Sequence, residues 1–281
     1  MKHFLRNFVT NRYSPDARQP GYERLRSVLR NTLLQKKLAS LRMCMLLVLG
    51  VTAVGLLVSP PSAPTEAAAL PLDGLTVALD PGHGGYDGGA RAHDSGLWEK
   101  ELTLQIALAV EEELKAQGAE VILTRREDLC LCEGDTASKA RKRADLQKRR
   151  TIAEESGADV LLSIHLNEYR DRAESGPQVF YQQGGDDGRL LAGALQQAMI
   201  DGLKPGKQRK AMAGDYYVLR GKLPSALVEC GFLSHPQEEK LLLDEAYHRR
   251  IGKALAQGLK TWLELRDRTS QNACAATLSM L

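Results

Sequence analysis

Strand-like and helix-like segments alternate along the chain from residue 75 to residue 265, and this alternation limits the folds open to it. Short apolar runs that end at turn residues predict strands, whereas the four-residue spacing of Leu102, Ile106 and Val110 predicts a buried helix face. Strands are expected at 75–79, 121–123, 160–164, 179–181, 216–219 and 226–228, and helices at 101–117, 139–156, 189–203 and 245–265. The sequence therefore predicts an α/β three-layer sandwich, in which a central, mostly parallel, twisted sheet of about six strands is flanked by helices.

The N-terminal part of the chain differs in charge and hydropathy from the rest. Residues 1–42 carry ten Lys and Arg against two acidic side chains, and sixteen uncharged residues follow, from Met43 to Val58. A basic flank before such a run predicts export, with the N-terminus in the cytoplasm. The expected divisions are a basic cytoplasmic leader (1–42), a transmembrane anchor or signal h-region (43–59), a Pro/Ala linker (60–73), a folded domain (74–266) and a flexible tail (267–281). A retained anchor is favoured, although Ala67-Ala68-Ala69 leaves cleavage open.

Charge and cysteine content exclude several classes of protein. Outside the leader the chain is mildly acidic, and the basic run Lys139–Arg150 is interpreted as a solvated helix face, so nucleic-acid binding is not expected. Cys130 and Cys132 form a C-x-C pair without a second pair at zinc-finger spacing, so no metal role is assigned to them and their redox state stays open. No G-x-S-x-G, H-E-x-x-H or phosphate-loop motif is present.

Three side chains with acid–base or metal-binding chemistry follow predicted strands. His83 comes after the first strand, and His165 and Glu229 each end an apolar run. Because the carboxyl ends of parallel strands meet at one edge of an open α/β sheet, we expect these side chains to converge there. Glu99 begins the first predicted helix and is a fourth candidate. A structural role for either histidine, and a capping role for Glu99, stay open at this stage, whereas Glu229 is costly to bury unless it is paired or liganded.

Four motifs in the same order resemble the zinc N-acetylmuramoyl-L-alanine amidases of the amidase-3 family. They are VALDPGHGGYDGGA at residues 77–90, Glu99-Lys100, SIHLN at 163–167 and LVECGFLS at 227–234. The resemblance implies that His83, Glu99 and His165 bind Zn2+, that Glu229 is the catalytic carboxylate, and that Asn167 contacts substrate. It also implies the phosphorylase/hydrolase-like sandwich of that family, with residues 74–266 as the zinc amidase catalytic domain.

The sequence is most similar to the CwlD-type spore-cortex amidases. The similarity rests on the anchor, on the absence of added wall-binding repeats and on the segment 215–224. This resemblance implies hydrolysis of the amide between the lactyl group of muramic acid and L-alanine, in formation of the muramic lactam of the cortex. The expected partners are peptidoglycan, the membrane through the apolar segment, and an activating lipoprotein or a downstream deacetylase. The expected location is the outer face of the cytoplasmic membrane, the wall or the forespore intermembrane space. A vegetative wall amidase and a catalytically idle peptidoglycan-binding scaffold are the alternatives.

Overall fold

The computed structural model describes residues 27–28, 30–32, 34–40, 42–43, 45, 70–133 and 137–278, with side chains as far as residue 271. Contacts divide the chain into two units, Met1–Ala67 and Ala68–Leu281. The described residues of the first unit are helical. Within the described residues, no helix combines the length and apolar character needed to cross a membrane. Apart from Met43 and Met45, the expected anchor at 43–59 lies outside the described residues, as does most of the linker.

The second unit is built on one six-stranded sheet. Its strands are β1 (Thr76–Pro81), β2 (Glu120–Leu123), β3 (Val160–Asn167), β4 (Gln178–Gln182), β5 (Met212–Gly214) and β6 (Ser225–Phe232), in the spatial order β2-β1-β3-β6-β4-β5. β1 pairs in parallel with β2 and β3, and β3 pairs in parallel with β6. β4 runs antiparallel to β6 and parallel to β5. The predicted fold class, a mostly parallel sheet flanked by helices, is therefore confirmed.

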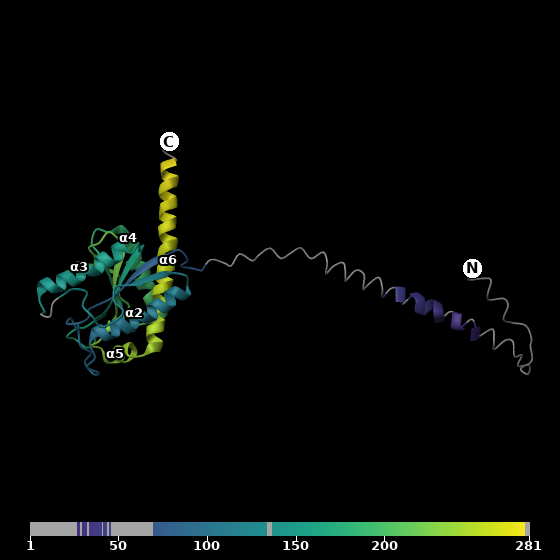
Figure 1. Ribbon diagram of the computed structural model, residues 1–281, viewed down its shortest axis with the longest axis horizontal. Helices are drawn as coiled ribbons and strands as arrows, with labels where there is room; N and C mark the ends of the chain where they lie inside the picture. The colour runs from purple at the N-terminus through teal and green to yellow at the C-terminus, as the bar shows by residue number, and fades with distance from the viewer. Residues whose placement is uncertain are drawn as a thin grey trace, which may run out of the picture. The chain divides into compact units, whose positions relative to one another are not determined.

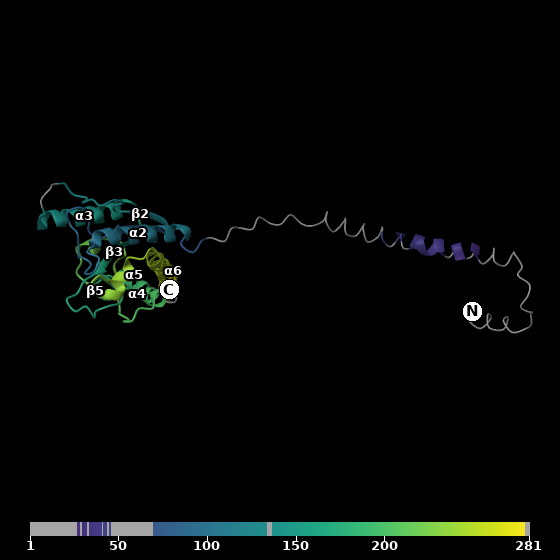
Figure 2. The same cartoon turned by 90° about the horizontal axis from the view of Figure 1, so that it is seen from below.

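Helices cover both faces of the sheet. One face packs on α2 (Glu99–Ala116), α4 (Asp186–Leu203) and α6 (Glu245–Leu278), which bury the larger core, including Leu102, Leu195 and Trp262. The other face packs on α3 (Lys139–Glu155) and the short 3-10 helix η1 (Tyr217–Leu219), over a smaller core. Figure 1 shows the helices around the sheet, and Figure 2 shows α3 apart from α4 and α6. α5 (Pro236–Leu242) follows β6 at the edge of the larger layer.

Two segments differ from their predicted structures. The strand predicted at 216–219 is wrong, because this segment forms η1, in which Val218 and Leu219 are buried against α3 rather than paired in the sheet. The strand in this part of the chain is β5, which ends just before η1. The composition predicts a flexible tail at 267–281, whereas α6 continues to Leu278 (Figure 1, yellow). No Gly or Pro follows Gly258 to end this helix.

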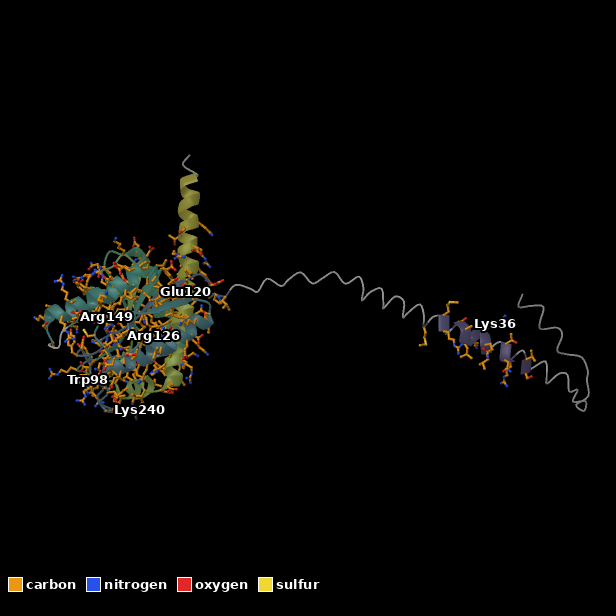
Figure 3. The ribbon with its side chains drawn as sticks, viewed as in Figure 1. Lys36, Trp98, Glu120, Arg126, Arg149 and Lys240 are labelled. Atoms are coloured by element: carbon orange, nitrogen blue, oxygen red, sulfur yellow. The ribbon has the colours of Figure 1, made fainter. Side chains whose placement is uncertain are left out.

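Charge on the outside of the domain contrasts with one charged cluster inside it. Glu120, Arg126 and Lys240 are exposed (Figure 3). Arg149 of α3, in contrast, is 1% exposed and lies beneath the loop that follows β1. A buried guanidinium requires several acceptors, so its position is specified by the groups around it.

Candidate active site

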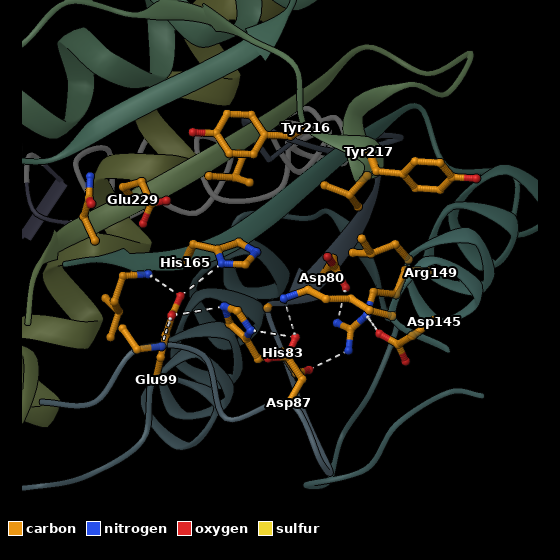
Figure 4. A pocket seen from close by; sticks show the side chains of 18 of the residues that line it. Asp80, His83, Asp87, Glu99, Asp145, Arg149, His165, Tyr216, Tyr217 and Glu229 are labelled. Atoms are coloured by element: carbon orange, nitrogen blue, oxygen red, sulfur yellow. Dashed lines mark hydrogen bonds and ion pairs between the residues drawn. The ribbon is translucent and has the colours of Figure 1, made fainter. Parts of the chain in front are cut away.

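The four candidate side chains meet at the carboxyl ends of the central strands. His83 lies directly after β1, His165 lies near the end of β3, and Glu229 lies opposite His165 in the pairing of β3 with β6. Glu99 is the first residue of α2, whose N-terminus approaches the same edge of the sheet. Figure 4 shows the four side chains around one cavity. The convergence expected from the sequence is present, including the contribution of Glu99.

A strained loop carries His83. Its φ of 61° is in the left-handed region, which is unfavourable for a residue with a side chain. Arg149 donates hydrogen bonds to the carbonyl oxygens of Pro81 and His83, at 2.7 and 2.5 Å. Arg125, also buried, donates to the carbonyl oxygen of Gly82 at 2.8 Å. The two guanidinium groups hold the backbone in this conformation, and a strained residue persists only where its surroundings specify it in this way.

Glu99 links the two histidines. Its Oε2 lies 3.1 Å from Nε2 of His83, and its Oε1 lies 3.0 Å from Nδ1 of His165. The backbone N–H groups of Ala90 and Leu166 also donate to this carboxylate, at 2.9 and 3.0 Å. Burial opposes ionisation of Glu99, but the bonds and charges of His165 and His83 outweigh it, so the pKa of Glu99 is well below its ordinary value.

The second ring nitrogen of His83 contacts another carboxylate. Nδ1 of His83 lies 3.0 Å from Oδ2 of Asp87, and Nζ of Lys142 lies 3.0 Å from the same oxygen. Burial lowers the pKa of His83, but the carboxylates of Asp87 and Glu99 have the larger effect and raise the pKa from its ordinary 6.5 to about 9. Metal-binding histidines commonly present one nitrogen to the metal and the other to a carboxylate, and Asp87 occupies that place beside His83.

The donor set fits a catalytic zinc ion. One ligand atom each from His83, Glu99 and His165 lies within 4.8 Å of the other two. Two imidazoles and one carboxylate, with the fourth position left for water or substrate, are typical of hydrolytic zinc sites. The carboxylate of Glu99 already lies between the two imidazoles, at 3.1 Å from His83 and 3.0 Å from His165, so all three ligands face one point that a cation can occupy.

Glu229 stands beside this cluster without a partner. Its Oε2 is buried and accepts no hydrogen bond from any described residue. Burial and the nearby charge of Glu99 raise the pKa of Glu229 to about 8, and His83 opposes this change. Of the two carboxyl groups, Glu99 is therefore held ionised while Glu229 is poised to exchange a proton near neutral pH. Such a separation of two carboxyl groups is typical of acid–base sites.

These side chains line a cavity of about 360 Å³. Tyr216 and Tyr217 form the wall opposite His83, and Lys142 and Leu146 of α3 form another part of the lining (Figure 4). Asn167 also lines the cavity, and its Oδ1 accepts a hydrogen bond from the backbone N–H of Glu168. The site is therefore open enough for an extended substrate.

A family model described as N-acetylmuramoyl-L-alanine amidase, amidase-3, matches residues 77–261, which include every strand of the sheet and all four side chains. The chain belongs to the amidase-3 family. The match confirms the membership of this family that the four motifs predicted. The matched residues also include η1 and the first half of α6, so the likeness extends over most of the second unit.

Several relatives of this amidase are known. A germination-specific N-acetylmuramoyl-L-alanine amidase of Bacillus subtilis (strain 168) is 37% identical over 193 residues, which are 68% of this chain and 81% of the relative. The CwlD amidase of Clostridioides difficile, solved in complex with the GerS lipoprotein, matches with a TM-score of 0.65 and 34% identity over 68% of this chain and 99% of that one. The catalytic domain of CwlV from Bacillus (Paenibacillus) polymyxa var. colistinus matches with a TM-score of 0.58 and 30% identity, over 68% and 98% of the two chains.

Several residues that support the amidase site are absent from the set predicted from the sequence. Asp87 and Lys142 reach His83 from the glycine-rich loop and from α3, and Arg125 and Arg149 hold its backbone. Asp87 follows His83 by four residues within the first motif and could have been found there. The other three come from elements distant in sequence, and only the folded chain brings them together.

Two residues that follow the SIHLN and LVECGFLS motifs have different surroundings in this amidase. Glu168 lines the cavity, and its Oε1 lies 3.5 Å from Nε2 of His93, so it adds negative charge to one edge. His235 is the N-cap of α5, where Nδ1 accepts from the backbone N–H of Glu238 at 3.3 Å. Glu168 therefore belongs to the site, whereas His235 serves the start of a helix.

Proposed function

We propose that this chain is a zinc-dependent N-acetylmuramoyl-L-alanine amidase that hydrolyses the amide between the lactyl group of muramic acid and L-alanine in peptidoglycan. The observation that carries the proposal is the convergence of two histidines and two carboxyl groups of opposite ionisation tendency in one open cavity. Membership of the amidase-3 family identifies the bond. The vegetative wall amidase is favoured less, because the relative named as a probable cell wall amidase, from Staphylococcus aureus, is 31% identical over 60% of its own length, against 37% over 81% for the germination-specific relative. The idle scaffold would require loss of one of the four side chains.

His83, Glu99 and His165 would hold the zinc ion. Zinc, when bound, supplies a Lewis acid for the carbonyl group and lowers the pKa of water toward about 7. Before zinc binds, Glu99 contacts both imidazoles through its two oxygens, and the backbone N–H groups of Ala90 and Leu166 keep the carboxylate in place. Asp87 orients His83 through its other ring nitrogen.

Glu229 would move the proton. It accepts a proton from the water that attacks the lactyl carbonyl, and then donates it to the amine nitrogen of L-alanine as the C–N bond breaks. Its raised pKa suits both steps, because the group gains and loses a proton at moderate pH. Asn167 lines the cavity two residues beyond His165 and would bind the substrate beside the bond that breaks.

The relatives support a role in the spore cortex. The Bacillus subtilis relative is named germination-specific, and the C. difficile relative was solved with a lipoprotein. We therefore propose that the muramic acid freed of peptide becomes muramic lactam, through a downstream deacetylase, and that a lipoprotein activates the enzyme. The basic leader and apolar run would anchor the catalytic domain, residues 74–266, at the outer face of the cytoplasmic membrane or direct it into the wall.

The test is digestion of purified peptidoglycan by the zinc-loaded full-length chain, followed by mass spectrometry, with Glu229→Gln as the matched variant. We expect released peptides with a free L-alanine amine and equal amounts of peptide-free muramic acid. Glu229→Gln should keep its zinc and lose about two to four orders of magnitude in rate. Peptides shortened at the other end would identify carboxypeptidase chemistry instead, and full turnover by the variant would remove Glu229 from the mechanism.

A further inference from the structure

A second group of metal-binding side chains lies beside the active-site loop, and the proposed mechanism does not use it. Cys130 and Cys132 lie in the connection between β2 and α3, and Asp145 lies on α3. One ligand atom from each lies within 4.8 Å of the other two. Both thiols are free and partly buried. In sequence the pair is unremarkable, and only the folding of α3 against this connection adds a third ligand.

Polar groups around the cluster have no partner. The Tyr86 hydroxyl and Nε of Arg141 are buried, and neither makes a hydrogen bond with any described residue. The Cys132 thiol donates to the carbonyl oxygen of Arg141 at 3.5 Å, which places this residue beside the cluster. The Arg141 guanidinium stacks on the Tyr86 ring, with Cζ 4.2 Å from the ring centre. Buried donors without acceptors are uncommon and require an explanation, and an ion with its charged ligands beside them is one that the adjacent cysteines and Asp145 supply.

We propose that Cys130, Cys132 and Asp145 bind a second metal ion of the zinc class, separate from the ion held by His83, Glu99 and His165. Two sulfur ligands and one carboxylate favour Zn2+ over Mg2+ or Ca2+, which prefer oxygen ligands. With both thiols ionised, the three ligands carry three negative charges. The metal together with Arg149 and Arg141 offsets them, and the Tyr86 hydroxyl gains an acceptor in the adjacent thiolates.

The carboxylate is already oriented for this role. Oδ1 of Asp145 accepts from the backbone N–H of Leu131 at 2.7 Å, and Oδ2 accepts from Nε of Arg149 at 2.7 Å. Each oxygen keeps a lone pair for a metal. Around a tetrahedral zinc ion the ligand atoms lie roughly 3.3–3.8 Å apart. The three ligand atoms lie within 4.8 Å of one another, so the separations exceed the upper end of that range by about 1 Å at most.

The second site would brace the first. The backbone N–H of Gly85 donates to Oδ1 of Asp128 at 2.7 Å, and a Cβ atom at Gly85 would lie 2.7 Å from the Cys130 nitrogen, so the two loops are in close contact. Asp145 also reaches the active site through Arg149, which donates to the His83 carbonyl oxygen (Figure 4). A metal at the cysteines therefore fixes the loop and the arginine that hold His83, without contacting the substrate.

The experiment counts metal ions on the full-length chain, kept reduced, stripped with chelator and reloaded with Co2+ or Zn2+. We expect two ions per chain and, with Co2+, the near-ultraviolet charge-transfer band of a cobalt–thiolate bond. The double variant Cys130→Ser/Cys132→Ser should bind one ion and lose the band. His83→Ala should also bind one ion but keep the band, which separates the second site from the proposed active site. Cys230→Ala, at a buried thiol outside the cluster, should match the wild type.

Two results would overturn the proposal. One is a single ion per chain and no thiolate band in wild-type protein whose Cys130 and Cys132 are shown to be reduced by thiol titration. The other is a Cys130–Cys132 disulfide in the protein as purified from cells without added oxidant, seen as a mass two hydrogens lower. Loss of peptidoglycan hydrolysis alone does neither, because it tests the first site.

Discussion

Replacement of Arg149 by methionine should destabilise the domain strongly at neutral pH. The guanidinium and the Asp80 carboxylate are each 1% exposed, and Nη1 of Arg149 lies 2.8 Å from Oδ1 of Asp80. Removal of one partner from a buried ion pair costs about 3–5 kcal/mol, because it leaves an uncompensated charge. Asp80 would keep the hydroxyl donors of Thr124 and Ser163, at 2.6 and 2.7 Å, so we expect a loss near the lower limit, about 3 kcal/mol.

The pH dependence of this loss is a sharper test than its size. In the wild type, burial opposes ionisation of Asp80 but Arg149 outweighs it, so the pKa of Asp80 is below its ordinary value of 3.8. Asp80 thus contributes stability that is present above that value and disappears as the pH falls. In the variant, burial is opposed by hydroxyl groups alone, the pKa rises, and the folded state gains stability from protonation in acid. The difference in free energy of unfolding between the wild type and Arg149→Met should therefore be smaller at pH 4 than at pH 7.

The assay is urea unfolding followed by tryptophan fluorescence, with chelator present so that metal affinity does not contribute. Of the two tryptophans, Trp262 is fully buried and reports unfolding, whereas Trp98 is exposed in the folded state. Lys148→Met, at the exposed neighbouring position of α3, is the matched control and should change the free energy of unfolding by less than about 0.5 kcal/mol. A loss below about 1 kcal/mol for Arg149→Met at pH 7, or an equal loss at pH 4, would refute the reasoning.

Three further predictions concern the active site. Gly82→Ala places a Cβ 2.4 Å from Cε1 of His165 and should therefore lower zinc affinity at least about tenfold, as measured by competition with a chelator. The control Gly193→Ala, whose Cβ meets no atom within 4 Å, should leave zinc affinity unchanged. The rate constant kcat/KM should rise with pH as Glu229 ionises. The midpoint should lie between the ordinary pKa of 4.5 and about 8, because a cation beside Glu99 lowers the pKa of Glu229. A midpoint outside that interval in a pH–rate profile would contradict the role of Glu229 as base. Zinc at one hundred times its Kd should raise the free energy of unfolding by about 2.7 kcal/mol over the metal-free protein, and calorimetry without such a change would exclude binding to the folded state.

The fold was largely predictable because its signals are local. Apolar runs and four-residue spacing placed all but one of the six strands and four of the major helices. The strand predicted at 216–219 was wrong because a short apolar run is buried equally well in a 3-10 helix packed on α3, and the run alone does not distinguish the two. The flexible tail predicted at 267–281 was wrong as far as Leu278, because polar composition does not end a helix when no Gly or Pro follows Gly258.

The sequence by itself determined the family, the order of the elements and the four side chains of the candidate site. Motif order and strand ends are properties of the chain, and parallel strands bring their carboxyl ends to one edge of the sheet. The tertiary structure decided what each side chain experiences. Glu99 and Glu229 are the same residue type, yet Glu99 lies between two histidines and Glu229 lies unpartnered beside a negative charge, so their pKa values move in opposite directions. Likewise, only the packing of α3 beneath the β1 loop brings Arg149 to His83 and Asp145 to the cysteines, because electrostatic energy depends on distance and burial in space rather than on separation along the chain.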